Sequence, residues 1–242
     1  MSNASKNYSK STCGSNKVVL GYRKFVASGG DWGAYAATRL GYAYPEKVPA
    51  IHLSFVPGGI SPPASSMSVP LSSAEVDLLA HRQKWAQDEG AYEHLQSTKP
   101  QTLACALNDS PAGLAAWIVE KMYSWSDCNG NIETVFSKDE ILTNISIYWF
   151  TRTIGSSIRL YSETQNNPWG LPEGTRVETP TGVAIFPKEL SVPPREWVDR
   201  MYNVQYWTEM PCGGHFAAAE QPELLVNDIR TFFRRFRGKV GR

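Results

Sequence analysis

The chain has 242 residues, of which 42% are hydrophobic, enough for one packed domain or for a core with a substantial insertion. Its formal net charge of +1 and scattered basic residues do not favour nucleic-acid binding, and no run of about 18 apolar residues predicts a membrane helix. The four cysteines form no CxxC pair and have no metal-ligand spacing with histidine, so we expect no metal site and a reduced, cytoplasmic protein.

The N-terminal part predicts a strand–helix–strand unit. Residues 1–20 are polar and lack the apolar segment of a signal peptide, so we expect a disordered or non-native start. Residues 25–27 then predict a short buried strand, and residues 32–44 a helix that ends before a proline. Residues 48–56 predict a second buried strand.

A Pro/Ser/Gly-rich stretch at 57–73 is the largest change of composition and predicts a boundary. The pattern after it is helical for almost ninety residues, which predicts a helical cap at 58–167 inserted into the core. Capping residues indicate three helix starts, at Ser72 with Glu75, at Ser110 with Pro111, and at Ser137 with Glu140, the last before a helical stretch that runs to Glu163.

Alternation returns in the C-terminal part. Strands are predicted at 179–187 and 204–210, with a helix at 194–202 between them and a final helix at 222–236. Strands that alternate with helices predict a parallel sheet with helices on its faces. We therefore expect an α/β core made of residues 21–57 and 168–242.

The first candidate site is the stretch "SGGDWGA" at 28–34, between the first strand and helix. A dinucleotide-binding loop would need a glycine at Ser28 and an acidic residue at the end of the next strand, and neither is present. The stretch instead matches the G-x-S-x-G nucleophile elbow with Asp31 in the serine position. A carboxylate there can attack carbon and form an ester. A simple helix cap by Asp31 remains an equal alternative on this motif alone.

The second candidate is His215 in "PCGGHFAAAEQPE", between the last strand and the last helix. Hydrolases of the α/β class place their base there, in the chain order nucleophile, acid, base. A lone histidine is more often a core residue. Its combination with the elbow favours a catalytic base.

Longer stretches support these two motifs. "GGDWGA", "YEHLQSTKPQTLACALNDSPAGLAAWIVEK", "LTNISIYWFTRTIGSSIRLYSE", "TPTGVAIFPKEL" and "GGHFAAAEQPELLVNDIRTFF" resemble the microsomal-type epoxide hydrolases, including the insect juvenile-hormone members. The resemblance extends from about Leu20 to Phe236 and corresponds to the C-terminal part of that family. It implies an α/β-hydrolase fold with an N-terminally truncated sheet and an inserted helical lid. It also implies hydrolysis of lipophilic epoxides to vicinal diols, as in detoxification, without a cofactor or a metal.

The resemblance also implies a role for each site residue. Asp31 would be the nucleophile, His215 the base, and Glu189 the acid that orients the base. Tyr92 and Tyr161 would hydrogen-bond the epoxide oxygen. Pocket positions fall on Trp32, whose backbone N–H would serve the oxyanion, on Trp149 in an aromatic-rich cap, and on Phe186.

Alternatives follow from what the family has before this region, namely four further strands and an HGxP-type loop. Without them the strand at 25–27 would be an exposed sheet edge, through which two copies could associate. The chain could then be an inactive fragment that acts, if at all, by association. A haloalkane dehalogenase is the enzyme alternative, since it also has an aspartate followed by tryptophan. The parent family is often associated with the endoplasmic reticulum membrane.

Overall fold

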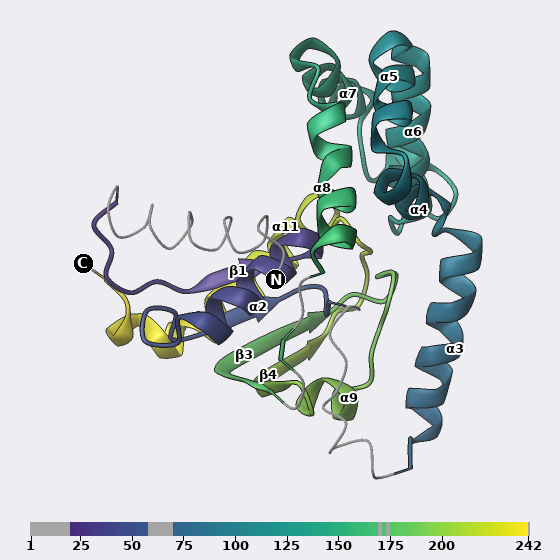
Figure 1. Cartoon of the computed structure of the whole chain (residues 1–242). Helices are drawn as coiled ribbons and strands as arrows, with labels where there is room; N and C mark the ends of the chain where they lie inside the picture. Colours follow the sequence, from purple (N-terminus) through teal and green to yellow (C-terminus); the bar gives the residue numbers. More distant parts are fainter. Residues whose placement is uncertain (1–19, 58–69, 169–170, 173–174, 242) are drawn as a thin grey trace.

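The computed structural model describes residues 20–57, 70–168, 171–172 and 175–241. The expected N-terminal segment therefore lies almost wholly outside the described residues, and so does most of the boundary at 57–73. In the described part of the chain, no helix is both long and apolar enough to cross a membrane. Figure 1 shows a sheet with flanking helices and a separate helical group at one end of it.

The described strands form a parallel sheet in the order β1-β2-β3-β4, as expected. They span Ala27–Gly29 (β1), Ile51–Leu53 (β2), Val177–Ile185 (β3) and Tyr202–Glu209 (β4). The first strand begins two residues later than predicted, because Phe25 bonds to Lys47 O and regular pairing starts only where Ala27 N bonds to Ala50 O. β1 lies at an edge of this sheet.

Helices cover both faces of the sheet because the side chains of a strand alternate between faces. On one face, Ile51 packs against α2 (Asp31–Ala43), where a Cβ on Gly41 would lie 3.1 Å from Ile51 Cγ2. On the other face, His52 meets α11 (Pro222–Phe233) and the ring of its Phe232. The shorter helices α9 (Arg195–Asp199) and α10 (Ala217–Glu220), and the 3₁₀ helix η4 (Arg234–Lys239), complete the core.

A buried polar network ties α11 to the sheet. His52 Nε2 lies 2.8 Å from Asp228 Oδ2, and the Tyr206 hydroxyl donates to Asp228 Oδ1 at 2.8 Å. His52 Nδ1 is 3.3 Å from Ser28 Oγ on β1. Because buried polar groups are costly unless they are paired, this network fixes how α11 sits under β2 and β4.

The helical group consists of α3–α8 and lies beyond one end of the sheet, with α3 running along its side (Figure 1). Both predicted capping boxes and the Ser110 cap are confirmed. Its apolar core gathers side chains from four helices: Leu103, Leu107, Leu114, Ile145, Ile154 and Ile158. The bounds are Ser73–Asp88 (α3), Ala91–Thr98 (α4), Pro100–Asp109 (α5), Pro111–Ser124 (α6), Ile132–Thr134 (3₁₀ helix η3), Lys138–Thr151 (α7) and Ile154–Asn166 (α8).

The long helical stretch predicted after Ser137 is in fact two helices. Arg152 adopts a left-handed backbone with φ 53°, and its N–H bonds to Trp149 O while Thr153 N–H bonds to Tyr148 O. This closing turn ends α7 without a glycine or a proline, which is why the sequence pattern did not reveal it. The turn redirects the chain, so that α8 runs back toward the sheet (Figure 1). Tyr161 on α8 contacts Trp32 of α2 at a ring-centroid distance of 5.3 Å.

Candidate active site

The turn between β1 and α2 presents Asp31. Its backbone is left-handed, with φ 42°, and the helix cap is Gly30, without a side-chain cap hydrogen bond. The alternative that Asp31 only caps the helix therefore does not apply. A Cβ on Gly29 would overlap the peptide of Gly33, so the end of the strand touches the first helical turn. The carboxylate is half exposed above this bend.

His215 reaches the same place from the loop after β4. Gly213 has φ +106°, and a Cβ on Gly214 would lie only 2.7 Å from Trp125 O. The N–H of His215 bonds to Trp125 O at 2.9 Å, which anchors the loop to the end of α6. His215 Nε2 then lies 3.7 Å from Asp31 Oδ2, an ion-pair distance longer than a hydrogen bond.

Glu189 completes the constellation from the loop after β3. Its Oε1 lies 2.6 Å from His215 Nδ1 and also accepts from Leu190 N–H at 2.7 Å. The backbone of Lys188 bonds to Gly213 O, so the two loops are linked directly. The Glu189 side chain is only 5% exposed, so it is a buried acid and not a solvated surface residue.

His215 lies in a largely apolar setting between two carboxylates. The edges of Phe55, Trp125 and Phe216 face its ring at centroid distances of 5.9, 5.4 and 5.3 Å. Burial opposes protonation, but Asp31 and Glu189 outweigh it and raise the pKa of His215 to about 9. The imidazole is therefore protonated at neutral pH.

Tyr92 on α4 and Tyr161 on α8 form the opposite side of the site. Their ring centroids lie 5.8 Å apart, and Tyr161 stands edge-on to Trp32 at 5.3 Å. Burial raises the pKa of both phenols, and the nearby Asp31 charge acts in the same direction. Both hydroxyls therefore stay protonated and can donate hydrogen bonds.

A cavity of about 300 Å³ joins these groups. Four of the eight predicted residues line it, and His215 and Glu189 lie behind Asp31. Several other lining residues were not predicted from the sequence, although Tyr35 was predictable because it follows Asp31 by one helical turn. The lining side chains are Asp31, Trp32, Tyr35, Phe55, Arg82, Trp85, Tyr92, Glu93, Tyr161, Leu190 and Ser191.

Two predicted pocket residues lie elsewhere. Trp149 is half-buried and packs against the apolar core of the helical group, so it does not line the cavity. Phe186 is fully buried at the end of β3, where its ring supports Gly213 in the His215 loop. Phe186 thus acts on the site only through that loop.

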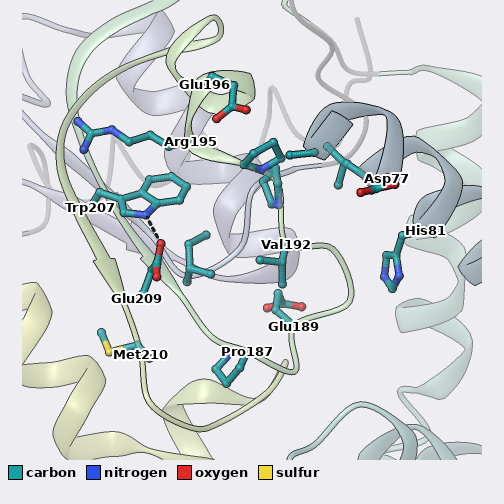
Figure 2. A pocket seen from close by; sticks show the side chains of 15 residues that line it. Asp77, His81, Pro187, Glu189, Val192, Arg195, Glu196, Trp207, Glu209 and Met210 are labelled. Carbon is teal, nitrogen blue, oxygen red and sulfur yellow. Dashed lines mark hydrogen bonds between the residues drawn. The ribbon is translucent and has the colours of Figure 1, made fainter. Parts of the chain in front are cut away.

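A second cavity of about 850 Å³ lies behind the loop that carries Glu189. Figure 2 shows Asp77 and His81 on α3 across from Trp207 and Glu209 on β4, with Glu189 between them. His81 Nε2 contacts Leu190 O at 3.1 Å. The loop is therefore a wall between two cavities, and α3 braces it.

Comparisons with known proteins identify relatives of this chain, although no family model matches it. Epoxide hydrolase 1 of Sus scrofa is 39% identical over 233 residues, which are 88% of this chain and 51% of that protein. The structure of Aspergillus niger epoxide hydrolase superposes with a TM-score of 0.75 at 30% identity, over 97% of this chain and 57% of that one. The crystal structure of juvenile hormone epoxide hydrolase from Bombyx mori superposes with a TM-score of 0.77 at 26% identity, over 92% of this chain and 57% of that one. The fold is that of the α/β-hydrolases, and the chain spans about half the length of its relatives.

The elbow geometry predicts opposite effects for its two glycines. Gly29→Ala puts a methyl group into the Gly33 backbone and should lower the free energy of unfolding by about 3 kcal/mol or more. Gly33→Ala meets no atom within 4 Å and should raise it by about 0.5–1 kcal/mol, because alanine favours the helix. Urea unfolding of both variants measures the difference. Equal stabilities would contradict the close approach.

The charge on His215 should make stability depend on pH. Because its folded pKa lies above the ordinary value, the charged ring stabilises the fold fully below about pH 6.5, and this contribution is lost as pH rises through about 9. The stability difference between the wild type and His215→Gln should therefore shrink by about 3 kcal/mol across this window. Unfolding at a series of pH values measures it, and a flat difference would contradict the ion pairs.

Proposed function

Because this chain is related in sequence and fold to the epoxide hydrolases, over about half of their length, we propose that it opens lipophilic epoxides to vicinal diols through an ester on Asp31. One observation carries the proposal. A half-exposed carboxylate on a strained bend and two protonated phenols line one cavity of about 300 Å³, and the His215–Glu189 pair lies 3.7 Å behind the carboxylate. Acyl transfer needs no such phenol pair, whereas ring opening needs donors for the epoxide oxygen.

In the first step, Asp31 attacks an epoxide carbon, and the carbon–oxygen bond of the ring breaks. Ring strain favours opening, but the oxygen leaves as a poor alkoxide. Tyr92 and Tyr161 donate hydrogen bonds to that oxygen and supply the proton it needs. Apolar walls, which include Trp32 and Trp85, would exclude water and hold the organic body of the substrate.

In the second step, His215 activates water. Ester formation removes the negative charge of Asp31, which is one of the groups that raise the pKa of His215. The imidazole can then give up its proton, returning it to the tyrosine that supplied it, and act as a base. Water loses a proton to His215 and attacks the ester carbonyl. The backbone N–H of Trp32, in the first turn of α2, stabilises the resulting oxyanion.

Two alternatives are also testable: that the chain is inactive by itself, and that two copies associate through the exposed edge of β1. Size-exclusion chromatography of the active fraction distinguishes them. Diol formation by a monomer contradicts both, and activity confined to a larger species supports association across β1.

Removing the base should trap the intermediate. With His215→Gln, incubation with styrene oxide should add the mass of one substrate to the peptide that holds Asp31, because the ester forms but its hydrolysis is slowed by roughly 10²–10⁴. Mass spectrometry of the digested protein locates the added mass. Asp31→Asn should carry none and should form no diol. Halide release from a bromoalkane, in place of diol formation, would instead indicate a dehalogenase.

Removing one phenol should slow only the first step. Tyr161→Phe should lower the alkylation rate by roughly 10²-fold, because Tyr92 alone then stabilises the alkoxide, and ester hydrolysis should be unchanged. Single-turnover kinetics with styrene oxide separate the two rates. Tyr123→Phe, at an exposed position on α6, is the matched control. Equal slowing of both steps would contradict the role.

A further inference from the structure

Arg82 brings an unpaired positive charge to the catalytic cavity. Its Nε donates to Ser191 Oγ at 3.0 Å, and its guanidinium carbon lies 5.8 Å from the centre of the Trp197 ring. Among the residues that the structure describes, no carboxylate pairs with it, and its Nη2 is buried without a hydrogen-bond partner. A guanidinium held in this way is costly unless it meets an acceptor.

Arg82 lies at the opposite end of a line of aromatic rings from Tyr92. A line of ring contacts runs from Tyr92 through Tyr161 and Trp32 to Tyr35, at centroid distances of 5.8, 5.3 and 5.5 Å. Arg82 interacts with Tyr35 at the far end of this line; burial lowers its pKa, and the Tyr35 interaction opposes that change. The cavity thus has its two phenols, Tyr92 and Tyr161, at one end of this line of rings and the Arg82 cation at the other.

We infer that Arg82 and Ser191 form a carboxylate-binding subsite, so that the preferred epoxides have an apolar body with an acidic group at the end remote from the ring. Ser191 engages only Nε, so the Nη donors remain for a carboxylate, and Nη2 has no hydrogen-bond partner among the described residues. Asp31 and Glu93 repel an acid elsewhere in the cavity, which fixes the orientation of the substrate. This inference rests on the proposed function.

The test compares two substrates of matched shape, para-carboxystyrene oxide and para-methylstyrene oxide. The wild type should favour the acid in kcat/KM by about tenfold or more. Arg82→Met should lower this ratio by about 10- to 100-fold, since a charge-assisted pair is lost. Arg82→Lys should recover part of it, because it keeps the charge but not the fork. Arg230→Met, at an exposed position on α11, should leave the ratio as it is.

A wild-type ratio near one, or an unchanged ratio in Arg82→Met, would overturn the subsite. A binding measurement separates this from failure of the proposed function. The diol of para-carboxystyrene oxide should quench tryptophan fluorescence at lower concentrations than the diol of para-methylstyrene oxide, since Trp32 and Trp85 line the cavity. If the acidic diol binds more tightly but neither epoxide is turned over, the subsite is supported and the hydrolase is rejected. If both epoxides are turned over without preference for the acid, the hydrolase is supported and the subsite is rejected.

Discussion

The site depends on a single backbone contact, the close approach of the end of β1 to the first turn of α2 at Gly29 and Gly33. That contact holds Asp31 in a left-handed conformation, at a cost of about 1–3 kcal/mol, and points its carboxylate away from the sheet. The parallel sheet then brings the other two site residues to Asp31. The loops after β1, β3 and β4 all begin at the C-terminal ends of their strands, which lie on the same side of a parallel sheet. Glu189 and His215 therefore lie beside Asp31, although they come from distant parts of the chain.

The charge of Asp31 explains how His215 could be a cation in the first step of the proposed reaction and a base in the second. Asp31 and Glu189 together raise the pKa of His215, and the Asp31 carboxylate lies 3.7 Å from Nε2 of the ring. Conversion of Asp31 to an ester would neutralise one of the two carboxylates. Ester formation needs no base, and His215 would become a base only after it, when the ester is hydrolysed. The buried Glu189 keeps the ring oriented throughout, because Oε1 is itself held by the N–H of Leu190.

Local signals in the sequence predicted local structure well. The capping pairs at Ser72 and Ser137 act within one helical turn, and the elbow needs only its glycines and Asp31, so both were readable from short stretches. Features that depend on tertiary packing were not readable. Nothing near Arg152 marks the end of α7, and Arg82 reaches the cavity only because α3 lies beside the Glu189 loop. His52 and Asp228 are 176 residues apart, and the acid on an otherwise apolar face of α11 was the only hint of their pairing.

Three consecutive residues of the loop after β3 contact both His215 and helix α3. Glu189 bonds to His215, the carbonyl of Leu190 contacts His81, and the hydroxyl of Ser191 accepts from Arg82. α3 therefore holds, by two side chains one residue apart, the same loop that orients the base. The hydrogen bond from Arg82 to Ser191 is made only two residues from Glu189, which bonds to His215. Under the proposed function, binding of an acidic group at Arg82 would therefore act on the same loop that orients His215.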